Sequence, residues 1–103
     1  MTEYNKLVRD KIPAIIEAQG EVANIRILDH KEYAACLAQK LNEEVAEFHR
    51  EQNLEELADI LEVVFALAES IGSSSGELLE VCEIKRKERG GFRNKVFLIS
   101  KED

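Results

Sequence analysis

The sequence has few cysteines, no long apolar run and no excess of positive charge, and each of these features excludes a class of protein. Two cysteines, Cys36 and Cys82, occur in 103 residues, too few for the disulfide framework of a small secreted domain. We expect both to be reduced, packed thiols. No apolar run approaches the ~18 residues of a membrane-spanning helix, and no charged-then-apolar leader opens the chain. These absences predict a soluble cytoplasmic protein that does not contact a membrane.

The charge is negative overall and unevenly distributed. The formal net charge of -7 argues against binding to a nucleic-acid polymer. Residues 41–80 contain eleven acidic residues and one basic residue, whereas residues 81–99 contain six basic and two acidic residues. Further cations lie near the start of the chain. An acidic middle between basic ends is what a metal-and-phosphate site requires, although ordinary solvated surface charge produces the same distribution.

Start and stop signals predict four helices in a single domain, residues 1–103. Asp29, Asn53 and Ser74 can each cap a helix N-terminus, and each precedes a glutamate by three residues. Pro13 suits the first turn of a shorter helix, which a glycine stops. The predicted helices cover residues 13–19, 29 to about 50, 53 to about 71, and 74 to the glycine pair at 90–91.

Two short apolar runs, residues 25–28 and 96–99, are predicted to be strands because they are rich in branched apolar residues. As the only two convincing strands, they are expected to pair with each other. The predicted fold class is therefore all-α, a helical bundle with a minor two-stranded β element.

Four carboxylates are placed symmetrically about the polar turn at residues 50–53. Glu44 and Glu47 lie three residues apart before the turn, and Glu56 and Asp59 lie three apart after it. Residues three apart share a helix face, so two antiparallel helices would place Glu47 opposite Glu56, with Glu44 and Asp59 about one turn deeper. Four oxygen donors would then converge on one position, as a hard divalent cation requires.

The donor types and the helix faces narrow the kind of ion. Glu44 falls within an apolar stripe of its helix, where an unpaired carboxylate is costly. The Glu-x-x-His pattern of di-iron bundles is absent, and neither His30 nor His49 is positioned to reach the site. Oxygen-only ligation favours Mg²⁺, with Mn²⁺ as an alternative. Exposed helices commonly carry similar acidic patterns without binding metal, so that reading also stays open.

Four basic residues could hold phosphates beside such an ion. Lys85 and Arg89 share one face of the last predicted helix and precede a glycine pair, while Lys6 and Arg9 lie three residues apart near the start. The competing interpretation is that these cations complement helix C-termini or solvate the surface.

In these motifs the sequence resembles the all-α nucleoside triphosphate (NTP) pyrophosphatases, the MazG-like superfamily. The acidic pairs match that superfamily's signature. The opening and closing segments look like a small subgroup labelled phosphoribosyl-ATP pyrophosphohydrolase-like, or predicted house-cleaning pyrophosphatases. The matching motifs are Glu43-Glu44-x-x-Glu47, Glu56-x-x-Asp59, residues 4–13 (YNKLVRDKIP) and, in residues 85–92, Lys85-Arg86-x-x-Arg89-Gly90-Gly91-Phe92.

The resemblance implies Mg²⁺-dependent hydrolysis between the α- and β-phosphates of a nucleotide, which yields a monophosphate and pyrophosphate. It implies metal ligation by the four carboxylates at positions 44, 47, 56 and 59. Glu43 or Glu47 would activate the attacking water. The expected substrates are non-canonical nucleoside triphosphates.

One departure from the family pattern separates this chain from true phosphoribosyl-ATP pyrophosphohydrolases. Those enzymes of histidine biosynthesis carry a histidine shortly after the second acidic motif, where this sequence continues Ile-Leu-Glu-Val-Val after Asp59. That activity remains an alternative, as does a non-catalytic helical interaction module with a structural ion or a basic partner. Because the helix at 53–71 is apolar around most of its circumference, we also expect a homodimer or larger assembly.

Overall fold

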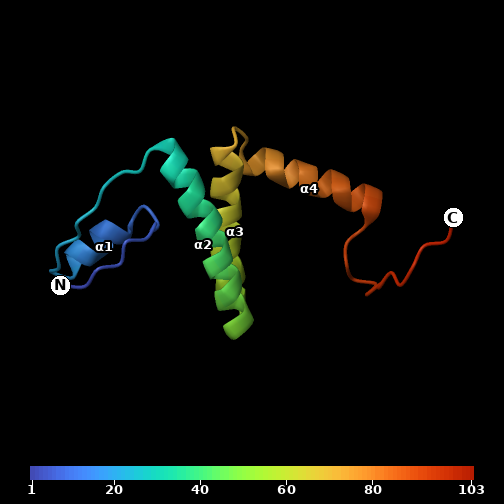
Figure 1. Cartoon of the computed structure of the whole chain (residues 1–103), viewed down its shortest axis with the longest axis horizontal. Coiled ribbons are helices and arrows are strands. Elements are labelled where there is room, and N and C mark those ends of the chain that lie inside the picture. The colour runs from blue at the N-terminus through green and yellow to red at the C-terminus, as the bar shows by residue number, and fades with distance from the viewer.

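The computed structural model describes residues 1–103 and contains four α-helices and no β-strand (Figure 1). The predictions of four helices and of an all-α chain are confirmed. None of the helices combines the length and apolar character needed to cross a membrane. The helices are α1 (Ile12–Ala18), α2 (His30–Arg50), α3 (Leu54–Ser70) and α4 (Ser75–Arg89).

The three long helices begin at side-chain caps. The Asp29 carboxylate accepts a hydrogen bond from the Glu32 amide at 2.8 Å, and Asn53 accepts one from the third helical residue of α3 at 2.9 Å. Ser74 does the same for α4 at 3.1 Å. Each cap satisfies an amide that has no partner within the helix and contributes about 1 kcal/mol. Local sequence therefore sets where each long helix starts.

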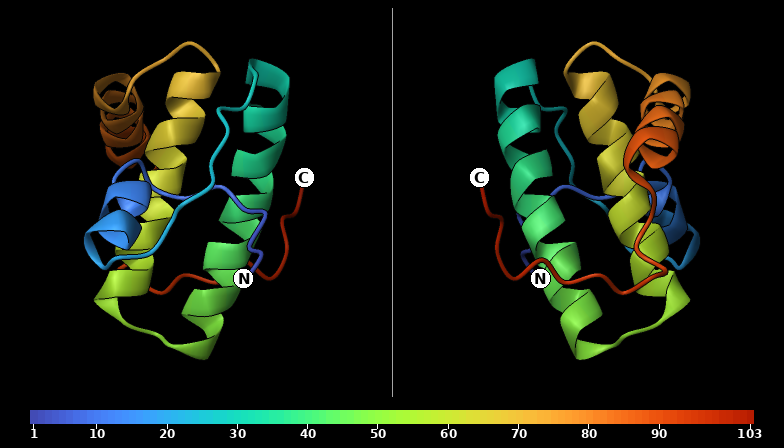
Figure 2. Two further views of the ribbon diagram at one scale, coloured as in Figure 1. Left: turned by 90° about the vertical axis from the view of Figure 1, so that its left-hand side faces the viewer. Right: turned by 90° about the vertical axis from the view of Figure 1, so that its right-hand side faces the viewer.

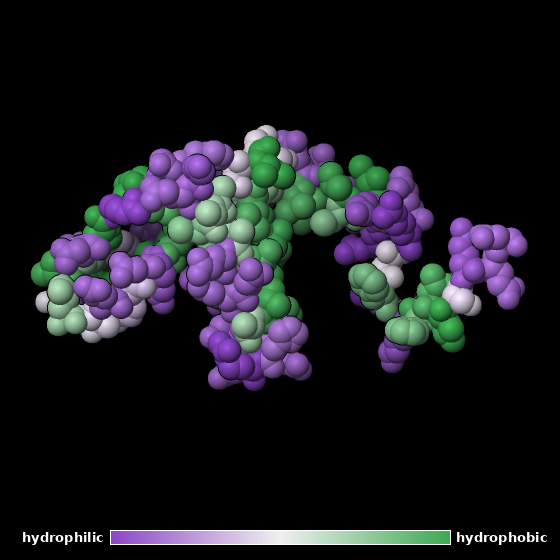
Figure 3. All heavy atoms as spheres, in the orientation of Figure 1, coloured by the Kyte–Doolittle hydropathy of each residue, from purple (hydrophilic) through white to green (hydrophobic).

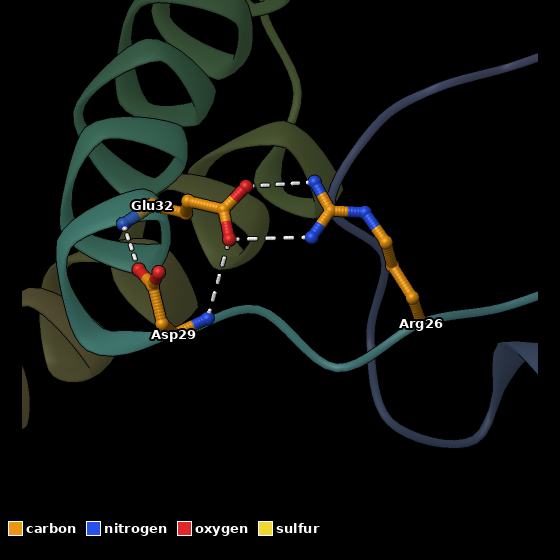
Figure 4. Close-up of polar contacts among 3 residues, drawn as sticks. All are labelled: Arg26, Asp29 and Glu32. Atoms are coloured by element: carbon orange, nitrogen blue, oxygen red, sulfur yellow. Dashed lines mark hydrogen bonds and ion pairs between the residues drawn. The ribbon is translucent and has the colours of Figure 1, made fainter.

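The cap of α2 is reinforced by an arginine from the preceding segment (Figure 4). Arg26 donates two hydrogen bonds to the Glu32 carboxylate, at 3.2 and 2.7 Å. The same carboxylate accepts a long hydrogen bond, 3.5 Å, from the Asp29 amide. Hydrogen bonds from Arg26 and from the Asp29 backbone hold the pKa of Glu32 below its usual value. The ionised form of Glu32 is thus favoured in the folded chain.

Glu32→Gln should lower the thermal midpoint at neutral pH, and the loss should disappear in acid. A carboxyl whose pKa is lowered by folding stabilises the fold above its unfolded pKa, about 4.3 for glutamate. That contribution vanishes as pH falls through the lower folded pKa. Thermal unfolding followed by circular dichroism from pH 7 to acid measures the difference, with Glu80→Gln, at an exposed residue of α4, as the control. A pH-independent difference would contradict the assignment.

Helices α2 and α3 form an antiparallel hairpin, joined by a short turn at residues 51–53 (Figures 1 and 2). The buried residues of the chain, Leu37 from α2 and Val63 and Ala68 from α3, lie in these two helices. The hairpin is therefore the structural centre, and it positions the acidic side chains described below.

The remaining elements diverge from this hairpin. Helix α1 lies on one side of it, while α4 leads away on the other and carries the C-terminal segment outward (Figure 1). The radius of gyration is 18.2 Å, against about 13 Å for a compact domain of 100 residues. Apolar side chains remain exposed along α3, α4 and the C-terminal segment (Figure 3). One chain alone does not enclose a core of the usual size.

The predicted pairing of residues 25–28 with residues 96–99 is wrong within this chain. Both segments lack regular secondary structure and lie on opposite sides of the hairpin (Figure 1). Paired strands must approach to about 4.8 Å, and the direction of α4 prevents this. The short apolar pattern indicated strand-forming residues but contained no information about whether they could meet.

Candidate metal centre

Three carboxylates converge at the interface of α2 and α3. Glu44 from α2 and Glu56 and Asp59 from α3 are half-buried, and one carboxylate oxygen from each lies within 4.8 Å of the other two. The i, i+3 spacing places Glu56 and Asp59 on one face of α3, and the short turn brings that face against α2. The structure therefore brings together three of the four predicted ligands.

Glu47, the fourth predicted ligand, is near the cluster but is turned toward its own helix. Its carboxylate accepts a hydrogen bond from Arg50, three residues later on α2. Its negative charge still acts on Glu56, as described next. A change of side-chain rotamer away from Arg50 would be needed for Glu47 to join the other three.

Within the cluster, Glu56 is the carboxylate whose ionised form is disfavoured. Burial, followed by the charges of Asp59, Glu47 and Glu44, raises the pKa of Glu56 above its usual value. Both causes disfavour the ionised form. A divalent cation would reverse this effect, since it favours ionised oxygen ligands. The donor set, the half-buried setting and the mutual repulsion all fit a hard cation such as Mg²⁺.

Glu56→Gln should raise the thermal midpoint of the metal-free protein at pH 7 and reduce the further rise caused by Mg²⁺. A carboxyl whose pKa is raised by folding stabilises the fold only below its unfolded pKa, and this contribution is lost as pH rises through the folded pKa. A neutral amide avoids that loss but is a poorer ligand. Differential scanning fluorimetry with chelator and with Mg²⁺ measures both effects. Glu55→Gln, one residue earlier and exposed, is the control; an equal metal response in wild type and Glu56→Gln would contradict the assignment.

Arg9 reaches this cluster from the N-terminal segment. Its guanidinium donates a hydrogen bond to the Asp59 carboxylate at 2.6 Å, joining residues fifty apart in the chain. Every other side-chain hydrogen bond connects residues no more than six apart. Arg9, predicted to bind substrate, therefore lies beside a predicted metal ligand.

A second cation, Lys40, was missed by the sequence reasoning. Its amine lies 3.7 Å from the Glu44 carboxylate, and these side chains are only 22% and 15% exposed, respectively. Their i, i+4 spacing on one helix is the sequence signal that predicts this pair. Arg9 and Lys40 together place positive charge on two sides of the acidic cluster.

Lys6 and Glu43, also predicted to act in the site, line a small pocket between the N-terminal segment and the middle of α2. The pocket has a volume of about 50 Å³, enough for water but not for a nucleotide. Lys6 lies 5.5 Å from the ring centroid of Tyr4. Lys40 connects this pocket to the carboxylate cluster through Glu44. The pocket is lined by Asn5, Lys6, Leu7, Cys36, Gln39, Lys40 and Glu43.

The remaining predicted substrate ligands, Lys85 and Arg89, are exposed on α4. Lys85 borders an open hollow of about 250 Å³ with the glycine pair and Phe92. Because α4 points away from the hairpin (Figure 1), neither residue joins the carboxylate cluster of its own chain.

Comparison with known proteins gives one short match. A protein of Mycolicibacterium smegmatis (strain ATCC 700084 / mc(2)155), described as an uncharacterized protein, is 55% identical over 42 residues. The match spans 41% of this chain and 43% of that protein's length. No protein-family model matches the chain, and no solved structure matches it.

Proposed function

We propose that this protein is a Mg²⁺-dependent nucleoside triphosphate pyrophosphohydrolase that removes non-canonical nucleotides. The observation that carries the proposal is the convergence of Glu44, Glu56 and Asp59 from two helices. Three oxygen donors in a half-buried position match the coordination chemistry of Mg²⁺, which commonly retains positions for substrate phosphates. The all-α architecture and the resemblance of the acidic motif to the MazG-like superfamily support the same reaction class.

The reaction requires a water oxygen to attack the α-phosphorus while the bond to the bridging oxygen breaks, so that pyrophosphate leaves with the electron pair. Glu43 or Glu47 would accept a proton from the water. Of these two carboxylates, Glu47 is the one whose charge contributes to the raised pKa of Glu56. A bound Mg²⁺ would neutralise phosphate charge and lower the pKa of water. Arg9 and Lys40, already beside the carboxylates, would bind phosphate oxygens.

Lys85 and Arg89 fit this proposal in an assembly of more than one chain. Helix α4 directs them away from the cluster of their own chain (Figure 1), so they could contact phosphates there only as residues of a second copy. We therefore include a homodimer or larger assembly in the proposed function.

The direct test is an incubation with Mg²⁺ and a panel of canonical, deoxy, damaged and phosphoribosyl nucleotides. The expected result is release of pyrophosphate and a nucleoside monophosphate in equal amounts, dependent on the metal. Chelator and Asp59→Ala serve as controls. Absence of pyrophosphate from every substrate would refute the hydrolase proposal.

A binding module is the second candidate function, and one observation favours it. Asp59, Glu44 and Glu47 each have a cation of their own chain as a partner, so part of the acidic charge is balanced without any ligand. Calorimetry separates the candidates, because Mg²⁺ binding without hydrolysis of any nucleotide would favour the module with a structural ion.

A further inference from the structure

Two segments of the chain have the properties of unpaired β-strands. No backbone amide or carbonyl of residues 22–28 or 96–99 takes part in a hydrogen bond within the chain. Exposed backbone groups in extended segments of branched apolar residues are a template for pairing with another strand. The structure excludes pairing within one chain, so these groups either face water or pair with a second molecule.

Most large apolar side chains of the two segments are also exposed. Ile27 is 87% exposed and Ile99 is 89% exposed, although such side chains each gain about 1.5–3 kcal/mol on full burial. The other large apolar side chains exposed in the two segments are Val22, Ile25, Val96, Phe97 and Leu98. Residues 96–99 form a contiguous exposed apolar run, and exposed apolar surface of this kind marks an interaction site.

The area of the chain indicates how much surface a partner must cover. The accessible surface is 9466 Å², about 3,600 Å² more than the ~5,900 Å² expected for a folded monomer of this mass. Obligate homodimers bury about 2,000–5,000 Å² in total. The excess accessible surface of two chains together is large enough to form such an interface. A short peptide would cover only part of this excess surface.

Charge favours a second copy of the same chain as that partner. Residues 81–99 carry six basic and two acidic residues, and α4 carries them away from the acidic hairpin of residues 41–70 (Figure 1). The acidic surface of another copy complements this basic segment. In a symmetric dimer, the basic segment of each copy would lie against the acidic surface of the other, so one kind of contact occurs twice.

We infer that two copies of this chain exchange their C-terminal segments, so that residues 96–99 of each copy pair with residues 22–28 of the other. The pairing supplies the missing backbone hydrogen bonds and covers both apolar segments. It occurs twice about a two-fold axis, which closes the assembly as a dimer. This inference concerns assembly and does not depend on the proposed hydrolase activity.

Disulfide trapping tests the exchange. In a chain with Cys36→Ser and Cys82→Ser, one cysteine is placed at Ile25 or Ile27 and a second at Val96 or Leu98, giving four double variants. After mild oxidation, at least one variant should run as a covalent dimer on a non-reducing gel. A monomer with an internal disulfide would overturn the exchange. Absence of any disulfide in all four would overturn it as well.

A backbone substitution gives a second, independent measurement. Leu98→Pro removes an amide donor from the proposed strand without adding charge, and Lys101→Pro is the matched control beyond it. Because the contact occurs twice, we expect the dimer to dissociate at a concentration roughly tenfold higher or more for Leu98→Pro. Sedimentation velocity over a concentration series measures this. If Leu98→Pro and Lys101→Pro dissociate at the same concentration, the pairing is overturned. A wild-type protein that stays monomeric and binds lipid vesicles or other proteins instead would overturn it as well.

Discussion

Asp59→Ala should abolish Mg²⁺ binding and nucleotide hydrolysis while leaving the helical content largely unchanged. Asp59 supplies one of three converging carboxylates, and Mg²⁺ depends on few protein ligands in a strict geometry. The side chain is also 42% exposed and is not part of the buried centre of the hairpin. Its removal therefore affects the site far more than the fold.

Isothermal calorimetry with Mg²⁺, together with far-ultraviolet circular dichroism, measures the two parts of this prediction. Glu55→Ala is a matched control, because that carboxylate belongs to the same helix, is exposed and has no ion pair. The control should bind Mg²⁺ as the wild type does. Unchanged metal affinity in Asp59→Ala would remove the metal assignment from this cluster.

Asp59→Ala also removes the ion-pair partner of Arg9, so the role of Arg9 needs a test of its own. If Arg9 only balances the charge of Asp59, Arg9→Gln should leave or improve Mg²⁺ affinity, since a competing cation is lost. If it also binds phosphate, as we propose, Arg9→Gln should weaken nucleotide binding at saturating Mg²⁺. The two titrations therefore separate a structural ion pair from a substrate contact.

In solution, the native protein should have at least twice the 11.7 kDa mass of one chain. Besides the proposed exchange of C-terminal segments, one reason is the apolar face of α3 that the hairpin does not cover, formed by Leu54, Leu57 and Leu61. Burial of each such side chain contributes about 1.5–3 kcal/mol before the entropy of association is subtracted. Leu61→Glu places a charge on that face, at the end farthest from the turn. It should raise the dissociation constant of the dimer tenfold or more.

Light scattering coupled to size exclusion, repeated over a range of concentrations, tests this prediction. Glu62→Gln is the adjacent control, on the side of α3 where Glu55, Glu62 and Glu69 repeat every seven residues. It should leave the mass unchanged. A wild-type mass of 11.7 kDa at high concentration would refute the assembly. A dimer that tolerates Leu61→Glu would instead show that this face of α3 is outside the contact.

These two results bear on different parts of the function. Loss of metal binding in Asp59→Ala concerns chemistry within one hairpin. Dissociation by Leu61→Glu concerns access to the basic residues of α4, a helix that leads away from the hairpin of its own chain (Figure 1). If both proposals hold, a monomeric variant should retain Mg²⁺ binding but lose nucleotide affinity.

The helices and the convergence of carboxylates followed from local sequence. Caps at Asp29, Asn53 and Ser74 act within one turn, so their effect does not depend on the rest of the chain. The meeting of Glu44 with Asp59 needed only helical periodicity and a turn too short to allow anything except an antiparallel hairpin. Both are short-range properties that a sequence contains in full.

The tertiary structure determined what joins residues far apart in the chain. The contact of Arg9 with Asp59, the outward direction of α4 and the separation of residues 25–28 from 96–99 depend on how the connecting segments run between helices. No local hydrogen bond encodes these paths, and apolar surface can be covered equally well by the same chain or by a second copy. The sequence by itself thus determined the four helices, the convergence of three carboxylates and the local Lys40–Glu44 pair, because all of these follow from helical spacing. The path of the chain determined that Arg9 lies beside Asp59 and that residues 25–28 and 96–99 do not pair.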